Sequence, residues 1–307
     1  MHEHTPGNMD SLKALFTSQL GPDMEDPEEE TFILFSQDIP SQNLGFIDPS
    51  ASTIELTVAG RDLTIHQSPA ILSSTRSGGT TGAVVWKVTP LFAEWISTPD
   101  NILASAGVIS RSSSVLELGC GTSAVVGLVL APSVASFTMT DQSYVARLVG
   151  QNMQENNNNS VKSKASKGRR AKSVPQQQQQ QQQALRFMPL DWETDQVTTS
   201  LIGSLHAKSF DLVIACDCIY NESLIEPLAQ TCVDACRLRE LEAAPSSDGA
   251  SLPTVCVVAQ QLRDPVIFES WIRRFHRSFQ VWRVPDANLP EGLRSTSGFV
   301  VHVGFLR

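Results

Sequence analysis

Short apolar runs alternate with helical patterns along most of this chain. Five runs read as strands, at residues 113–118, 136–141, 185–192, 210–217 and 254–260. Two more runs, at residues 280–284 and 298–306, have no helical pattern between them, so they are expected to pair antiparallel. The chain is therefore predicted to form a doubly wound, mostly parallel seven-stranded α/β sheet with an antiparallel C-terminal strand pair.

The N-terminal third follows a different pattern. Apolar and polar side chains alternate around a turn within residues 53–66, which predicts a β-hairpin, and residues 86–96 suit a helix. Acidic residues dominate the stretch before Thr31. We expect a flexible acidic segment over residues 1–30, a hairpin and lead helix packed on the core over residues 31–98, and a ligand-binding domain over residues 99–307.

Residues 155–184 interrupt the pattern between the second helix and the third strand. This insert joins an asparagine run to a basic stretch, with six Lys or Arg within residues 160–175, and then to eight glutamines. Such a composition buries too little apolar surface to order itself, so we expect a disordered loop. The basic stretch also has the composition of a nuclear-import or nucleic-acid patch.

Composition narrows the class of protein. The 307 residues carry 23 basic and 32 acidic side chains, a net charge of −9, and no apolar run long enough to span a membrane. An acidic surface argues against a general nucleic-acid binder and suits a basic protein partner. The six cysteines form no Cys-x-x-Cys pair and no zinc spacing, so we expect buried thiols in the cytoplasm or nucleus.

The strongest local signal is a strand that runs into two glycines and then a helix. Glu117 lies in the strand, and Gly119 and Gly121 follow it. Glycines let the backbone approach a ligand closely, and free N–H groups at a helix start can face an anion. Asp141 ends the next strand, 20 residues after Gly121, where a carboxylate accepts hydrogen bonds from ribose hydroxyls. The pattern predicts a nucleoside-containing ligand.

A dinucleotide is one nucleoside-containing ligand that fits these glycines. The spacing Gly119-x-Gly121-x-x-Ala124 matches a dinucleotide fingerprint, which indicates an NAD-type oxidoreductase. Against that, Glu117 suits the ammonium group of a ligand better than a pyrophosphate, and Asp191-Trp192 offers an acceptor and an aromatic face for adenine. The antiparallel terminal pair is also foreign to the dinucleotide fold.

The combined motifs resemble the seven-β-strand S-adenosylmethionine-dependent methyltransferases. Asp217-Cys218-Ile219-Tyr220 resembles the Asp/Glu-x-x-Tyr/Phe signature of the family-16, lysine-type protein methyltransferases, as does Thr81-Gly82 followed by Trp86. The order of these motifs is similar to fungal ribosomal lysine N-methyltransferases over roughly residues 31–307. The resemblance implies a Rossmann-like methyltransferase fold, S-adenosylmethionine as cofactor, and a protein substrate, in particular a ribosomal protein.

The resemblance also implies a role for each matching residue. Asp217 and Tyr220 are expected to be catalytic, lining the acceptor channel and orienting the lysine amine. The remaining matches are expected to bind the cofactor: Trp86, Glu117, Gly119, Gly121, Asp141, Asp191, Trp192 and Ala215. No metal is needed, because the methyl group of a sulfonium is already activated and the enzyme supplies alignment and electrostatics.

Two rivals to protein-lysine methylation remain open. Methylation of a nucleic-acid amine is usually marked by Asp/Asn-Pro-Pro-aromatic at the fourth strand, and residues 217–220 lack prolines. A flipped base also needs a basic approach surface. A cofactor-binding scaffold without activity is the second rival. We expect an enzyme, a monomer, without direct nucleic-acid or membrane binding, in the cytoplasm with the nucleus as the alternative.

Overall fold

The computed structural model describes residues 9–41, 43–75, 79–165, 184–204, 207–242 and 252–307. A seven-stranded sheet forms its centre, in the order β5-β4-β3-β6-β7-β9-β8. Neighbouring strands from β5 to β7 are parallel, and β9 runs antiparallel to both β7 and β8. The strands are β3 (Ser114–Leu118), β4 (Ser136–Asp141), β5 (Leu185–Pro189), β6 (Leu212–Cys216), β7 (Val255–Gln261), β8 (Phe279–Arg283) and β9 (Phe299–Leu306). The predicted α/β sheet with its antiparallel terminal pair is confirmed.

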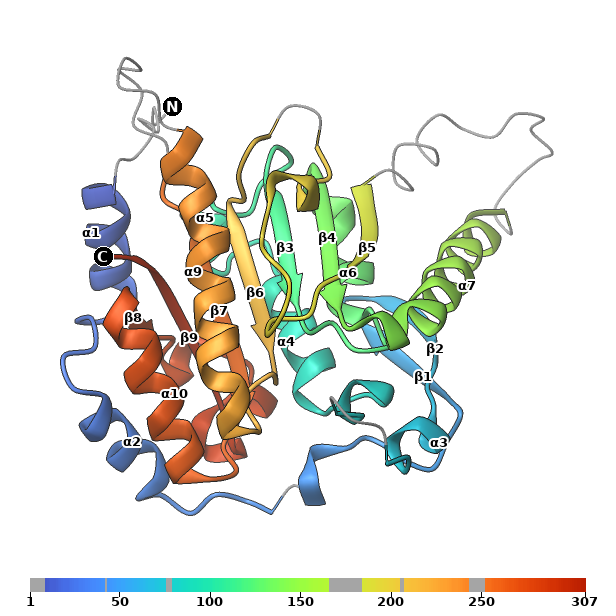
Figure 1. Ribbon diagram of the computed structural model, residues 1–307, viewed down its shortest axis with the longest axis horizontal. Helices are drawn as coiled ribbons and strands as arrows, with labels where there is room; N and C mark the ends of the chain where they lie inside the picture. The colour runs from blue at the N-terminus through green and yellow to red at the C-terminus, as the bar shows by residue number, and fades with distance from the viewer. Residues whose placement is uncertain (1–8, 42, 76–78, 166–183, 205–206, 243–251) are drawn as a thin grey trace.

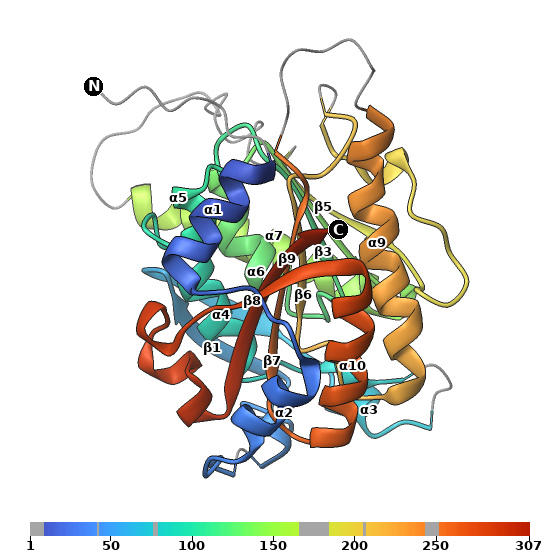
Figure 2. The same ribbon diagram turned by 90° about the vertical axis from the view of Figure 1, so that its left-hand side faces the viewer.

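Helices cover both faces of this sheet (Figures 1 and 2). One face carries α9 (Ile225–Glu242) and α10 (Pro265–Ser278), with α2 (Pro27–Phe35) against α10. The other face carries α1 (Met9–Leu20), α4 (Val88–Ile96), α6 (Val125–Leu130) and α7 (Ala146–Ala165). The short helix α5 (Ile102–Ser105) completes this side, and the short helix α3 (Pro69–Leu72) contacts the turn at Thr81–Ala83. In the described part of the chain, no helix is both long and apolar enough to cross a membrane.

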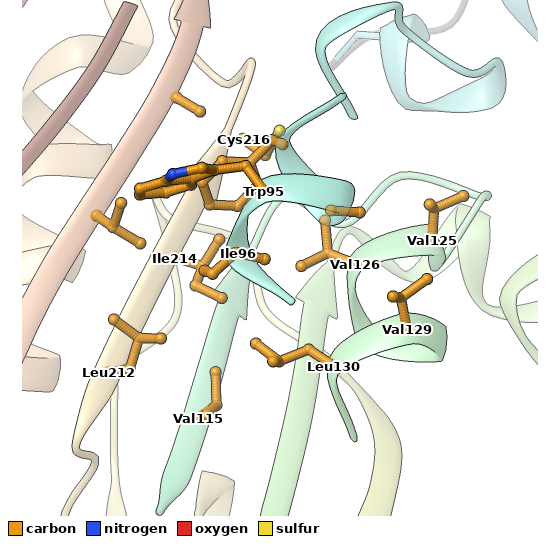
Figure 3. Packing of buried hydrophobic residues seen from close by; sticks show 14 of the residues in the cluster. Trp95, Ile96, Val115, Val125, Val126, Val129, Leu130, Leu212, Ile214 and Cys216 are labelled. Carbon is orange, nitrogen blue, oxygen red and sulfur yellow. The ribbon is translucent and has the colours of Figure 1, made fainter. Parts of the chain in front are cut away.

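Burial on both faces explains the apolar strand sequences. All five residues of β3 and all five of β6 are buried, as expected for parallel strands covered by helices on each side. Alternate side chains point to opposite layers, so Val115 and Ile214 face α4 and α6, whereas Ala215 faces α9. Figure 3 shows the first layer, where Trp95 and Ile96 of α4 lie over these strands beside the valines of α6.

Residues 1–30 differ from the expected flexible segment wherever the structure describes them. Residues 9–20 form α1, in which Phe16 is fully buried and meets the ring of Trp282 at 5.4 Å between centroids. The acidic stretch opens α2, where Asp26 accepts a hydrogen bond from the backbone N–H of Glu28 at 2.8 Å. Acids in a first helical turn complement the helix dipole, so charge density here promotes a helix rather than disorder.

The predicted hairpin is present as β1 (Thr53–Val58) and β2 (Arg61–His66), a separate two-stranded sheet. The two residues between the strands, Ala59 and Gly60, have φ of 49° and 69°, the left-handed conformation of a tight hairpin turn.

Two asparagines of α7 complete the hydrogen bonding of β2. Asn152 accepts from the backbone N–H of His66 at 2.7 Å and donates to its carbonyl at 2.9 Å. Asn156 does the same with Thr64, at 2.9 and 3.0 Å. Asn156 lies within the expected insert at 155–184, so the insert begins as an ordered continuation of α7 as far as Ala165. The predicted disorder of residues 166–183 lies outside the described residues.

Candidate functional site

A cavity lies at the carboxyl ends of β3, β4, β5 and β6, the edge where parallel α/β sheets usually bind ligands. One wall is the segment 79–89, which precedes and opens α4, and the opposite wall follows β5. Eight of the ten predicted site residues line it: Trp86, Gly119, Gly121, Asp141, Asp191, Trp192, Asp217 and Tyr220. The structure therefore brings together predicted residues that are up to 134 positions apart in the sequence, from Trp86 to Tyr220.

The two loop glycines are required by close packing. Gly119 has φ of 71°, and a Cβ on it would lie 2.6 Å from the Sγ of Cys218 and 3.1 Å from the Trp192 ring. Gly121 has φ of 60°, and its Cβ would lie 3.1 Å from the carbonyl oxygen of Gly82. No ordinary side chain fits either position without displacing these neighbours. The loop is also tied to segment 79–89, because the Thr122 N–H donates to the Gly82 carbonyl at 2.7 Å.

Asp141 supports the loop and still faces the cavity. One carboxylate oxygen accepts the backbone N–H of Gly121 at 2.9 Å, and the other accepts the N–H of Gln142 at 2.7 Å. Burial raises the pKa of Asp141 to about 6, although these two hydrogen bonds pull it down. A carboxylate in this place is ionised at neutral pH and suits hydrogen-bond donors such as ribose hydroxyls.

Glu117 lies in β3, next to the glycine loop, rather than on the cavity surface. Its side chain is 2% exposed, and Oε2 has no hydrogen-bond partner among the described residues. Burial, with the negative charge of Asp141, raises the pKa of Glu117 to about 8. A buried carboxyl group without a partner is costly, which is the condition expected when its partner is a cationic ligand.

The wall after β5 combines a carboxylate with an aromatic ring. The backbone N–H of Glu193 donates to one Asp191 oxygen at 3.0 Å, and the Gln142 side-chain amide donates to the other at 3.4 Å. The Trp192 ring packs on Gly119, and its indole N–H is buried with no partner in the described structure. This wall offers a flat apolar face, a free donor and a carboxylate acceptor, which together match the chemistry of adenine.

Trp86 and Tyr220 both line the cavity and both bond to Thr81. The Trp86 indole N–H donates to the carbonyl of Thr81 at 3.0 Å, and its ring meets Phe46 at 4.4 Å between centroids. Tyr220 bonds through its hydroxyl to the Thr81 side chain, and burial raises the pKa of this phenol, so it stays neutral at physiological pH. Both aromatic side chains shape the mouth of the cavity rather than its floor.

Asp217 carries an ion pair that sequence reasoning missed. Its carboxylate is 2% exposed and receives two guanidinium bonds from Arg263, both of 2.6 Å, and a 3.2 Å bond from the backbone N–H of Gln261. The signal was hidden because Arg263 follows β7, 46 residues further along the chain, and only the β6–β7 pairing brings the two together.

Ala215 is the predicted residue that lies farthest from the expected place. It is fully buried in β6, packs in the layer covered by α9, and is not among the residues that line the cavity. Its small side chain lies behind the strand end rather than against a ligand.

The thiols of Cys120, Cys216 and Cys218 surround the same strand ends, and burial raises the pKa of each, so they remain neutral.

The residues present fit S-adenosylmethionine. Its ammonium group would meet the unpartnered Glu117 carboxyl, its ribose Asp141, and its adenine the Trp192 ring with Asp191. All six cysteines are buried and free, and the described residues contain no group of three or more side chains placed to hold a metal ion.

Comparison with known families gives a match over residues 66–240, more than half of the chain, to the family described as lysine methyltransferase. Among curated proteins, "Ribosomal lysine N-methyltransferase 5" of Zygosaccharomyces rouxii is 31% identical, over 69% of this chain and 70% of that protein. The protein of the same name in Vanderwaltozyma polyspora is 28% identical, over 66% of this chain and 76% of its own.

A third curated relative carries a different name. "Diaminohydroxyphosphoribosylamino-pyrimidine deaminase" of Schizosaccharomyces pombe is 27% identical over 84% of this chain, and the chain spans only 53% of that protein. Zinc deaminases use a Cys-x-x-Cys pair, and the present sequence contains none. The name of that relative therefore gives no reason to expect deamination here.

Similar solved structures are methyltransferases with low identity. The N-methyltransferase NodS of Bradyrhizobium japonicum is 13% identical, with a TM-score of 0.37, over 66% of this chain and 89% of that one. The tRNA (uracil-54, C5)-methyltransferase of Pyrococcus abyssi is 14% identical, with a TM-score of 0.38, over 84% of this chain and 44% of that one.

Proposed function

Because this chain belongs to the lysine methyltransferase family, we propose that it transfers a methyl group from S-adenosylmethionine to the side-chain amine of a lysine in a ribosomal protein. Membership of this family confirms the prediction of a family-16 methyltransferase made from the glycine loop and Asp217–Tyr220. The ribosomal substrate rests on the names of the two fungal relatives.

The observation that carries the cofactor assignment is the unpartnered Glu117 carboxyl beside the glycine loop. The cofactor supplies a methyl group already activated on a sulfonium. Glu117 and Asp141 are proposed to bind its ammonium and ribose, and the Trp192 wall its adenine. A carboxyl group that is protonated in the free protein and ionised beside a cation couples cofactor binding to proton release.

The acceptor side is assigned to Asp217 and Tyr220. Trp86, which the sequence predicts to contact the cofactor, is proposed to border the acceptor side as well. A lysine amine has an ordinary pKa of about 10.4 and must reach the cavity without its proton to act as a nucleophile. Neutral aromatic walls lower the pKa of a buried amine, because they disfavour its charged form. The part of Tyr220 and Trp86 is to shape a narrow apolar slot that admits the end of one side chain.

A protein substrate remains preferred over a nucleic acid. The net charge of −9 suits a basic protein partner, and the sequence lacks prolines between Asp217 and Tyr220. The proposal keeps the expectations of a monomer without direct nucleic-acid binding. A ribosomal substrate also implies work in the cytoplasm or the nucleus.

The test combines binding with transfer. Calorimetry with S-adenosylhomocysteine measures cofactor binding, and incubation of labelled S-adenosylmethionine with isolated ribosomal proteins, and separately with isolated RNA, measures transfer. We expect binding and one labelled protein band, in which mass spectrometry locates a methylated lysine. Binding without any labelled protein would support the scaffold, labelled RNA would support the nucleic-acid rival, and absence of binding by folded protein would refute the proposal.

A further inference from the structure

Asp217 lines the cavity, and both oxygens of its carboxylate are hydrogen-bonded. Arg263 donates to both oxygens at 2.6 Å, and Gln261 adds a backbone donor at 3.2 Å. The carboxylate is 2% exposed, whereas the Arg263 side chain is 22% exposed. A buried carboxylate held by a two-bonded guanidinium is poorly placed to take a proton from a substrate.

Arg263 also fixes the wall beside this carboxylate. Its guanidinium lies over the Trp86 ring, 4.9 Å from the ring centroid, and donates to the carbonyl of Leu44 at 3.3 Å. The next residue, Gly45, has φ of 92°, and a Cβ there would meet the Arg263 guanidinium at 2.8 Å. Phe46 then forms a β-bridge with Trp86. One side chain therefore holds the end of β6, the Trp86 ring and segment 43–46 together.

This arrangement has an electrostatic consequence for an amine in the cavity. A free carboxylate next to the amine would favour its charged form and keep it protonated, which is the unreactive state. A paired carboxylate loses most of this effect. The other titratable groups around the cavity are the neutral thiols of Cys120, Cys216 and Cys218, the neutral phenol of Tyr220, the side chain of Tyr144, the carboxyls of Glu117 and Asp141 at the glycine loop, and Asp191 on the far wall.

We propose that Arg263 is a positioning residue for methyl transfer: it neutralises and orients Asp217 at the cavity mouth, so that the acceptor amine binds without its proton. The inference deepens the proposed function and depends on it. Asp217 then acts as the anchor for Arg263 and Trp86, and the proton of the amine is lost to water before the side chain enters.

The test is the pH dependence of kcat with the full-length enzyme and its protein substrate. In Arg263→Gln, the unpaired Asp217 carboxylate raises the pKa of the bound amine, so the acidic limb of the kcat profile moves up by about one pH unit. At pH 7 kcat falls about tenfold, by that same shift. KM for the protein does not rise, because the carboxylate attracts a charged lysine.

Three further variants separate charge from folding. Asp217→Asn combined with Arg263→Gln removes both charges, and the acidic limb returns to its wild-type position. Arg263→Lys keeps the charge but loses the two-bonded geometry, so kcat falls while the limb stays in place. Arg239→Gln is the matched control, because Arg239 pairs with Asp211 at the opposite end of β6, at 2.6 Å, and its loss leaves the limb unmoved.

Cofactor binding distinguishes this inference from the proposed function. Calorimetry with S-adenosylhomocysteine gives affinities for Arg263→Gln within about twofold of wild type, since the cofactor is assigned to other residues. A uniform fall in kcat at every pH in Arg263→Gln, with no displacement of the acidic limb, would overturn the inference, as would a limb that stays displaced in the double variant. Loss of cofactor binding in the wild-type protein would refute the proposed function instead.

Discussion

The two ends of β6 each carry an aspartate paired with an arginine, and they differ in nearly everything else. At the amino end, Asp211 accepts the backbone N–H of Ser114 at 2.7 Å and the Arg239 guanidinium at 2.6 Å. Arg239 also bonds the Phe210 carbonyl, at 2.7 Å. These groups join β6 to β3 and to α9. Neither Asp211 nor Arg239 is among the residues that line the candidate site cavity.

The carboxyl end gathers several unpaired polar atoms and a strained backbone position, whereas the ion pair at the amino end leaves Arg239 Nε without a partner among the described residues. Glu117 Oε2, the Trp192 indole N–H and the Gln261 side-chain oxygen lack partners among the described residues. Gly119 and Gly121 have positive φ, and so does Asp217, at 58°. Unsatisfied buried polar atoms cost stability, and so does left-handed backbone at a residue with a side chain such as Asp217, so their concentration at one edge indicates that a ligand and a substrate complete it. The amino end shows what a purely structural ion pair looks like.

The largest effect on ligand binding at the carboxyl end of the sheet is expected at Gly119. In Gly119→Ala, the new methyl group would collide with Cys218 and Trp192, and φ of 71° adds backbone strain. We expect the affinity for S-adenosylhomocysteine to fall by about 100-fold, or ~2.7 kcal/mol. Gly107→Ala is the matched control, because Gly107 has φ of 74° but nothing within 4 Å of its Cβ position. Equal losses of binding in both variants would assign the effect to strain alone.

The structural end should respond in stability only. Asp211→Ala removes charged hydrogen bonds to Ser114 and Arg239, and we expect the free energy of unfolding to fall by about 2 kcal/mol. Urea denaturation measures this change. Binding of S-adenosylhomocysteine to the folded fraction should remain unchanged, and weakened binding would show that the two ends are coupled.

Glu117 should reveal its charge through pH. Its pKa of about 8 lies above the unfolded value near 4.5, so the folded protein binds more protons in this window and its stability falls as pH rises through it. We expect wild-type affinity for S-adenosylhomocysteine to increase about fivefold from pH 7 to 8, as the carboxyl group ionises. Glu117→Gln should bind weakly at both pH values and lose the slope.

The same variant gives an independent check in the absence of ligand. Glu117→Gln removes the charge that opposes folding at high pH, so its thermal midpoint at pH 9 should exceed that of the wild type. Differential scanning calorimetry measures both proteins. A lower midpoint for the variant would contradict a buried, unpartnered carboxyl group at this position.

The smallest effects are expected where α7 meets the hairpin. Asn156→Ala loses two hydrogen bonds to Thr64, at a cost of about 1 kcal/mol in unfolding, with cofactor binding unchanged. Asn152→Ala additionally loses its 2.7 Å bond to the Thr122 carbonyl in the loop after the glycines. We therefore expect it to weaken cofactor binding about threefold as well. Identical binding by the two variants would show that the loop does not depend on α7.

The sheet could be predicted because its strands are buried on both faces. A continuous apolar run is buried completely only in a strand that helices cover on both faces. Such runs are Val115, Leu116 and Leu118 in β3 and the residues of β6. The glycine loop and Asp141 were readable because their spacing is local to one strand–helix–strand unit. The cofactor-binding role of Glu117 stays a prediction, because its side chain is buried beside the loop and is not among the residues that line the cavity.

What could not be predicted depends on pairing between distant segments. Arg263 meets Asp217 only through the order of β6 and β7, and segment 43–46 reaches Trp86 only after both have folded. The acidic stretch before Thr31 misled because composition counts charges without their places in a helix, where Asp26 caps α2 and Glu30 is buried against His302 at 2.9 Å.

The side-chain amides of Asn152 and Asn156, which bond the backbone of β2, affect whether another chain can pair with this strand and whether the following insert can change in length. A lone hairpin exposes a row of backbone groups to which a strand of another chain can add. Asn152 and Asn156 occupy those groups at Thr64 and His66, so this edge offers no template for intermolecular growth. Since both asparagines precede the basic and glutamine-rich parts of the insert, those parts could lengthen or shrink during evolution while leaving these hydrogen bonds intact.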